Sequence, residues 1–179
     1  MLIVGLLSTS EYSRDRVKGR LEEYYGTSMW VGKTLPFTYT DYYNNEMGEG
    51  IERDFLAFEN LIDPSELAEV KIRCNAIEEE FVDGATPYGA GAHGSAEGLG
   101  TVAGRRVNID PGLLSLGKLI LASTKNHAHR IPLKEGIYGE VTLIYRDKSY
   151  RSLPWTYADY RSDEYLEVFH RLRKKLKKS

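Results

Sequence analysis

Residues 123–130 hold the densest group of reactive side chains in the chain: a lysine, an arginine, two hydroxyls and two of the four histidines. They directly follow the apolar run 119–122, which is typical of a buried strand. Binding loops are often placed at the ends of such strands. The segment therefore predicts a site for chemistry on an anion or with a metal, without deciding between them.

A phosphate or a carboxylate suits the cations of this segment, because lysine and arginine both pair with such groups and hydroxyls add hydrogen bonds. An exposed basic loop is an equally weighted alternative. Arg53 is a further cation of interest, although it could instead pair with an acid such as Glu46. The residues that we expect to hold an anion are Arg53, Ser123, Thr124, Lys125 and Arg130.

Three other polar clusters accompany this segment: residues 39–48, 108–112 and 155–160. Glu140 adds a carboxylate in the middle of a predicted strand. If the clusters converge, their carboxylates and imidazoles could transfer protons or bind a divalent metal. The candidate catalytic residues under this hypothesis are Glu46, Asp110, His129, Glu140 and Asp159.

Each of these patterns also has a structural explanation. His127 and His129 would face the same side of a strand, as a metal site requires, but ordinary surface or hydrogen-bonded histidines are the favoured interpretation. The run Asp110-Pro111-Gly112 is equally well explained as a turn. The identity of a metal is left open.

Aromatic residues concentrate in two of the clusters, 39–48 and 155–160, in a chain with thirteen tyrosines. A ring that also carries a hydroxyl suits stacking on bases or sugars. A seam between sheet and helix, with the hydroxyls reaching water, is the favoured alternative. The predicted ligand contacts are Tyr43, Trp155 and Tyr157.

Two glycine-rich stretches resemble phosphate-binding motifs but lack their context. Residues 26–34 have five residues between the glycines where a P-loop has four, and a helix is expected before them instead of after them. Residues 89–94 match G-x-G-x-x-G, but no strand precedes them. Neither stretch is predicted to bind a nucleotide.

The composition is that of an ordinary soluble globular protein, with 41% hydrophobic and 28% charged residues. No apolar run approaches the roughly 20 residues of a membrane span. A single cysteine, Cys74, excludes an internal disulfide, so we expect a cytoplasmic protein without membrane contact. Six basic side chains fall within residues 171–178 although the net charge is −2. They could contact nucleic acid, but complementing a helix dipole is the favoured explanation.

Hydrophobic periodicity and cap residues place seven strands and three helices. The strands are expected over residues 2–7, 28–37, 51–58, 105–110, 119–123, 137–145 and 150–153. The helices are expected from the caps at 8–10 to Gly26, from 63 to 81, and from 162 to 176. The second helix carries an apolar stripe that includes Cys74, which is therefore assigned to the core. Its polar row, Lys71, Asn75 and Glu78, is better explained as a solvated flank than as the edge of a site.

The order of these elements begins β-α-β-β-α-β, which is the ferredoxin-like pattern, and adds further strands and a C-terminal helix. We therefore expect an α+β fold in a single domain, 1–179, with helices against one mixed, mainly antiparallel sheet. Residues 83–104 contain seven of the seventeen glycines and predict a flexible loop.

Taken in order, these clusters resemble an uncharacterised bacterial and archaeal family, domain of unknown function 4416. The long segment 83–104 and His127 depart from the family pattern, which favours His129 acting with Arg130 over a histidine pair. The resemblance implies no activity, and the "GTP-binding" label of some members gains no support from residues 26–34. It rests on Pro36-Phe37-Thr38, Tyr42-Tyr43, Glu46-Met47-Gly48, Arg53, Phe58-Glu59, Lys71, Asn75, Glu78, Asn108-Ile109-Asp110-Pro111-Gly112, Leu121-Ala122-Ser123-Thr124-Lys125, His129-Arg130, Gly136-Ile137-Tyr138, Glu140-Val141-Thr142-Leu143, Trp155-Thr156-Tyr157 and Asp159-Tyr160.

Three functions remain open, and the fold alone does not choose among them. The leading hypothesis is an enzyme or sensor that binds a small phosphorylated or carboxylated ligand, with a divalent metal as a candidate cofactor. A non-catalytic RNA- or nucleotide-binding module would use the tyrosines and the basic terminus. A protein-interaction domain would use the loop at 83–104. The oligomeric state is not predicted.

Overall fold

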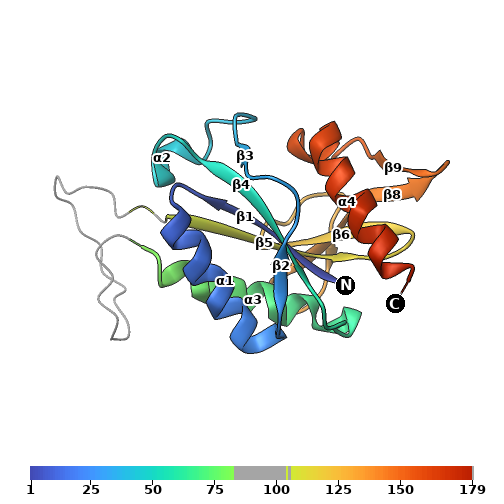
Figure 1. Ribbon diagram of the computed structural model, residues 1–179, viewed down its shortest axis with the longest axis horizontal. Coiled ribbons are helices and arrows are strands. Elements are labelled where there is room, and N and C mark those ends of the chain that lie inside the picture. The colour runs from blue at the N-terminus through green and yellow to red at the C-terminus, as the bar shows by residue number, and fades with distance from the viewer. Residues whose placement is uncertain (83–103, 105, 179) are drawn as a thin grey trace.

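One antiparallel sheet forms the centre of the protein. The computed structural model describes residues 1–82, 104 and 106–178 (Figure 1). Its nine strands follow the order β2-β4-β1-β5-β6-β8-β7, with β3 also beside β4 and β9 beside β8. The predicted α+β class and mainly antiparallel sheet are confirmed, and no parallel pair is found in the part of the chain that the structure describes.

Most of the predicted elements are present. In the first half they are β1 (Leu2–Ser8), α1 (Glu11–Tyr25), β2 (Ser28–Trp30), β3 (Leu35–Pro36), α2 (Asn44–Met47) and β4 (Glu52–Phe58). The second half contains η1 (Pro64–Glu66), α3 (Leu67–Glu79), β5 (Val107–Leu114), β6 (Lys118–Ser123), β7 (Ile131–Pro132), β8 (Tyr138–Arg146), β9 (Ser149–Ser152), η2 (Asp159–Arg161) and α4 (Asp163–Leu176).

Side-chain caps explain where the helices begin. The Ser10 hydroxyl accepts from the Ser13 amide at 3.2 Å at the start of α1, and the Ser162 hydroxyl does the same for Tyr165 at 3.3 Å at the start of α4. Such a cap satisfies one of the amides that a helix leaves without a partner. Gly26 ends α1 with a φ of +78°, a conformation that glycine adopts without strain.

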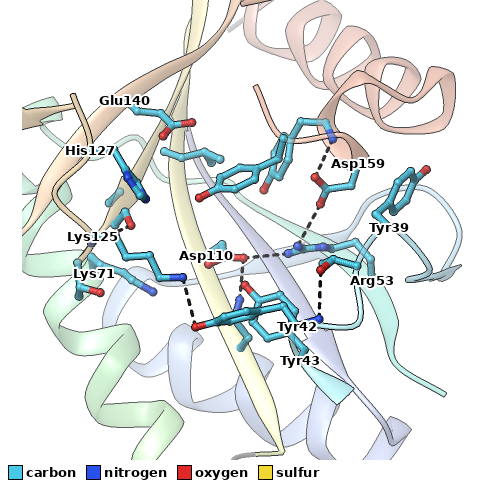
Figure 2. Close-up of a pocket in the computed structure, with 18 of the residues that line it drawn as sticks. Tyr39, Tyr42, Tyr43, Arg53, Lys71, Asp110, Lys125, His127, Glu140 and Asp159 are labelled. Carbon is cyan, nitrogen blue, oxygen red and sulfur yellow. Dashed lines mark hydrogen bonds and ion pairs between the residues drawn. The ribbon is translucent and has the colours of Figure 1, made fainter. Parts of the chain in front are cut away.

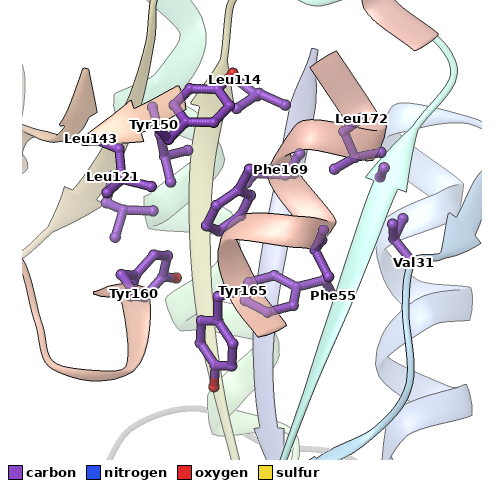
Figure 3. Packing of buried hydrophobic residues seen from close by; sticks show 14 residues of the cluster. Val31, Phe55, Leu114, Leu121, Leu143, Tyr150, Tyr160, Tyr165, Phe169 and Leu172 are labelled. Carbon is purple, nitrogen blue, oxygen red and sulfur yellow. The ribbon is translucent and has the colours of Figure 1, made fainter. Parts of the chain in front are cut away.

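The sheet is covered on both faces (Figure 1). Helices α1 and α3 pack on one face, where Leu2, Val4 and Leu6 of β1 meet the stripe that contains Cys74. Helix α4 covers part of the other face, where its residues Tyr165 and Phe169 pack against the sheet (Figure 3). All of β1 is therefore buried, and the assignment of Cys74 to the core is confirmed.

The predicted strand 28–37 is wrong as a single element, because it is divided into β2 and β3. Both parts pair with β4, and the chain between them passes through Gly32 with a φ of +88°. Residues 26–34 thus follow directly on α1 and contain strand β2, which is not the strand-loop-helix arrangement of a P-loop. The predicted loop 83–104 lies outside the described residues apart from Gly104.

The turn interpretation of Asp110-Pro111-Gly112 is also wrong, because these residues continue β5. On one edge, β5 pairs with β1 from Val107 to Leu113, which is all of the strand except its last residue. On the other edge its ladder with β6 reaches only as far as Gly112, opposite Leu121. Pro111 has no N–H to extend that ladder, so the two strands separate beyond it.

Short elements were missed altogether: α2, β7 and η2 have between two and four residues each. No helix in the described ranges combines the length and the apolar character needed to cross a bilayer.

Candidate functional site

A cavity of about 640 Å³ lies where β5 and β6 separate (Figure 2). Ligand-binding pockets in proteins typically measure roughly 300–1,000 Å³. Its walls come from α3, from β4, β5, β6 and β8, and from the segments before α2, after β6 and before α4. The lining residues are Phe37, Tyr39, Thr40, Tyr42, Tyr43, Arg53, Lys71, Asn75, Glu78, Asn108, Asp110, Leu121–Lys125, His127, Arg130, Glu140 and Tyr157–Tyr160.

The four polar clusters predicted from the sequence all contribute to this one cavity. Three of the thirteen candidate residues do not line it: Glu46 is exposed on α2, and His129 and Trp155 lie behind Glu140. The ten that do are Tyr43, Arg53, Asp110, Ser123, Thr124, Lys125, Arg130, Glu140, Tyr157 and Asp159.

Arg53 is the buried cation of the site, with only 2% of its surface exposed. Its Nη1 lies 3.2 Å from Asp110 Oδ2, and its Nη2 lies 3.3 Å from Asp159 Oδ2. The sequence allowed a pair with Glu46, but the structure instead joins Arg53 to carboxylates that follow it by 57 and 106 residues.

Gly5 in β1 makes the Arg53–Asp110 contact possible. It faces Asp110 across the β1–β5 ladder and lies next to Arg53's strand, β4. A Cβ atom at this position would lie 2.7 Å from Arg53 Nη1 and 3.0 Å from the Tyr160 hydroxyl. The missing side chain therefore leaves the space through which the guanidinium crosses β1.

The pKa values of the two carboxylates bound to Arg53 are shifted in opposite directions. Burial disfavours the charged form of Asp110, but Arg53, Lys71 and a hydrogen bond from Asn108 outweigh it, so its pKa lies below the ordinary value. Burial dominates at Asp159 and raises its pKa, although Arg53 acts in the other direction. Opposite shifts in the pKa values of two neighbouring acids recur at sites of proton transfer.

Arg130 is held entirely by the protein. Its Nε donates to Glu140 Oε2 at 2.7 Å, its Nη1 to Ser123 Oγ at 2.8 Å, and its Nη2 to the Tyr157 hydroxyl at 2.7 Å. Both Arg130 and Glu140 are almost completely buried. Arg130 therefore shapes the wall of the cavity, with each of its nitrogens already engaged by a protein oxygen.

The two histidines lie in the connection between β6 and β7, not on a strand. Their rings stack at 5.8 Å, and His129 stacks in turn on Trp155 at 5.2 Å. His129 Nε2 lies 3.1 Å from Glu140 Oε2. His129 and Trp155 thus support Glu140 from behind, while His127 reaches the cavity.

Lys125 differs from Arg130 although only five residues separate them. Its Nζ lies 3.4 Å from the Tyr42 hydroxyl and 4.5 Å from the centre of that ring (Figure 2). Within the described part of the chain, no carboxylate forms an ion pair with it. The Ser123 hydroxyl nearby accepts from Lys125 N and Arg130 Nη1, which leaves its own proton to donate.

The polar row of α3 was wrongly explained as a solvated flank. Lys71 and Glu78 are only 6% and 8% exposed and line the cavity together with Asn75. Lys71 Nζ donates to Ile109 O at 2.8 Å, and Ile109 N donates to Glu78 Oε1 at 2.6 Å. Lys71 and Glu78 thus form the hydrogen bonds of the Ile109 backbone groups at a point where β6 no longer pairs with β5. The sequence held one indication that these residues are buried, because the polar row lies directly beside the apolar stripe of the helix.

Tyrosines surround the opening of the cavity. Tyr39, Tyr42 and Tyr157 line it and are each between 42% and 55% exposed. Tyr160 and Tyr165, by contrast, are buried between the sheet and α4. Tyr39, Tyr42 and Tyr157 are therefore placed where they could stack on a ligand, whereas Tyr160 and Tyr165 belong to a seam between sheet and helix.

The described residues do not supply a set of ligands for a metal ion. Among them, no group of three or more histidine, cysteine, aspartate or glutamate side chains is placed to hold a metal ion. Asp110 and Asp159 are bound to the cation Arg53 instead.

A family model for a domain of unknown function, DUF4416, matches residues 1–176. The chain belongs to this family. The resemblance inferred from the ordered motifs is thereby confirmed. No curated protein and no solved structure matches the chain. The description of DUF4416 states no activity, so function has to be argued from the cavity itself.

Proposed function

We propose that the cavity binds a small phosphorylated or carboxylated ligand and that the protein is an enzyme acting on this ligand or a sensor of it. The observation that carries the proposal is convergence: polar side chains from seven separate stretches of the chain line one cavity of suitable size. Charged and polar groups are costly to bury, and such a concentration is more common at functional sites than elsewhere.

Lys125 is the residue proposed to bind the anion. It lies in the cavity wall with no carboxylate partner among the described residues, and Ser123 and Thr124 stand beside it. A lysine ammonium has three donors, of which Tyr42 takes one. Arg53 and Arg130 add positive potential. All three Arg130 nitrogens and both Arg53 Nη atoms are bound to the protein, whereas Arg53 Nε has no partner among the described residues.

Proton transfer is proposed as the chemistry, if the protein is an enzyme. Asp159 has a raised pKa and Asp110 a lowered one, and both line the cavity. Two acids whose pKa values are shifted in opposite directions suit the donation and the acceptance of protons within one site. In a sensor, the same groups would only bind the ligand. A divalent metal remains a prediction without ligands assigned to it.

We also propose that the core of the fold has the ferredoxin-like topology. The sheet order β2-β4-β1-β5 places β1 and β2 parallel with β4 between them, and α1 and α3 pack on the same face. This arrangement supports a split β-α-β core.

A thermal-shift panel of phosphorylated and carboxylated compounds tests the proposal. A ligand at 100 times its Kd stabilises the folded state by about 2.7 kcal/mol, which is about 5–11 °C for a chain of this size. Lys125→Met should abolish the shift. Lys118→Met is the matched control, because Lys118 is exposed at the opposite end of β6 and does not line the cavity. Equal shifts in both variants would refute the assignment of Lys125.

The RNA-binding alternative would use the tyrosines at the opening of the cavity together with a second, basic surface at the C-terminus. The basic residues at 171–178 fall on the last part of α4 and directly after it, and none of them lines the cavity. Replacing the exposed basic side chains Arg171, Lys174, Lys177 and Lys178 with glutamine keeps the core residue Leu172 and should leave binding of small anions unchanged. Salt-sensitive RNA binding that these substitutions remove would instead favour the alternative.

A further inference from the structure

We propose that the ligand is a polyhydroxylated anion, namely a sugar phosphate or a sugar acid. Its anionic group would lie at Lys125, and its hydroxyls would lie between Asp110, Asp159 and Tyr160. This inference rests on the proposed function and specifies the class of ligand that the same cavity takes.

The cavity has two chemically different ends (Figure 2). Lys125 and Lys71 lie on one side of it, and Asp159 with Arg53 lies on the other, while Asp110 stands between them. The first end offers hydrogen-bond donors, namely the Lys125 ammonium and the Ser123 hydroxyl, which suit phosphate or carboxylate oxygens. The second end offers carboxylate oxygens, which would repel an anion. A ligand that fills the cavity must therefore differ along its length.

Tyr160 determines what the second end can accept. It lines the cavity, is 2% exposed, and its hydroxyl has no hydrogen-bond partner among the described residues. Buried polar groups are nearly always satisfied, so an orphaned hydroxyl beside a cavity indicates a missing partner. Burial holds the pKa of Tyr160 well above its ordinary value, so the hydroxyl keeps its proton and can donate.

A ligand hydroxyl is the group that fits these neighbours. It can accept from the Tyr160 hydroxyl and donate to a carboxylate of Asp110 or Asp159 at the same time. An ammonium group could only donate, and would leave Tyr160 without an acceptor. A second phosphate or carboxylate could only accept, and would face two acids. Arg53 already offsets one of the two negative charges at this end, which further disfavours a cationic ligand.

The aromatic rim is consistent with a sugar. The rings of Tyr42 and Tyr157 are about half exposed at the opening, and each offers an apolar face with a polar edge. A sugar has the same mixture of C–H faces and hydroxyl edges.

The experiment crosses two tyrosine variants with a graded set of ligands, using calorimetry on the full chain. Tyr160→Phe removes the buried, unpartnered hydroxyl of a residue that lines the cavity. Tyr165→Phe is the matched control, because its hydroxyl is also buried without a partner but does not line the cavity. The ligands are inorganic phosphate, ribose, ribose 5-phosphate, glucose 6-phosphate and gluconate.

We expect ribose 5-phosphate, glucose 6-phosphate or gluconate to bind more tightly than inorganic phosphate in the natural protein. Tyr160→Phe should weaken that binding about 3- to 10-fold, the effect of one hydrogen bond. It should leave the Kd of inorganic phosphate unchanged, and Tyr165→Phe should change neither. Lys125→Met should weaken the binding of all of the anions.

The outcomes separate this inference from the proposed function. If simple anions bind through Lys125 but sugar phosphates and gluconate bind no more tightly, the polyhydroxylated ligand is refuted and the anion site stands. If no anion binds in a Lys125-dependent way, the proposed function itself fails. Equal losses in Tyr160→Phe and Tyr165→Phe would also overturn the inference. The ligand comparison on the natural protein applies even if a variant does not fold.

Discussion

Replacing Arg53 with methionine tests the central electrostatic arrangement of the site. Methionine is unbranched like the arginine stem and would keep much of the packing in place. It would remove the cation that holds Asp110 at 3.2 Å and Asp159 at 3.3 Å. Asp159 is only 5% exposed, so water could not replace the lost partner.

The expected loss of stability is large. Removing one member of a buried ion pair costs about 3–5 kcal/mol, because the remaining charge stays buried without compensation. With a urea m-value of about 2 kcal/mol/M, the midpoint of unfolding should fall by about 2 M. Arg146→Met is the control: this side chain is 79% exposed and, among the described residues, bonds only its neighbour Asp147, so the change should cost less than about 0.5 kcal/mol.

The loss should also depend on pH in a definite direction. Without Arg53, the folded-state pKa values of both aspartates should lie above the unfolded value of about 3.9. The folded variant would then bind more protons than the unfolded chain, so its stability should rise as the pH falls from 7 towards 4. Urea titrations at both pH values measure this. The quantity to compare is the loss in free energy of unfolding of Arg53→Met relative to the natural protein. A loss that is the same at both pH values, or one below about 1 kcal/mol at pH 7, would refute the buried-cation argument.

Three further predictions follow from the same contacts. Gly5→Ala places a Cβ 2.7 Å from Arg53 Nη1, and urea unfolding should show a loss of about 1–3 kcal/mol from overpacking; unchanged stability would contradict the close approach. Glu140→Gln removes the charge that neutralises buried Arg130 and should lower stability by about 3 kcal/mol in the same assay, whereas Glu167→Gln on the exposed side of α4 should have no effect. Cys74 is fully buried, and burial raises its pKa to about 12, so a thiol reagent should modify it only after unfolding; rapid modification of the native protein would show that α3 opens.

The elements that the sequence predicted correctly are those with both a periodic pattern and a cap. The helices α1 and α4 begin at serines that cap them, and α3 follows a turn that Asp63 caps. The division of residues 28–37 was missed because apolar residues continue across it, and Gly32 was the one local signal. Pro111 was assigned to a turn on local preference, but pairing with β1 keeps it in a strand. Pairing with a distant strand overrode the local signal.

The location of the site was more predictable than the roles within it. Clusters of charged and aromatic residues at the ends of strands predicted the segments that meet at the cavity. The difference between Lys125 and Arg130 could not be predicted, because it depends on partners that come from β8 and from the segment after β9. Likewise, Lys71 and Glu78 are recognisable as wall residues only once Ile109 lies beside α3.

The opening between β5 and β6 connects the fold to the proposed function. A continuous ladder would satisfy the edge of β5 with backbone groups and would leave no cavity. Pro111 ends that ladder, and the buried side chains of Lys71 and Glu78 supply the missing partners of Ile109. Because both are engaged in this way, they are expected to maintain the opening. Under the proposed function, the groups expected to contact a ligand are among those whose donors or acceptors the protein does not fully use, and they include Lys125, Ser123, Asp110, Asp159 and Tyr160.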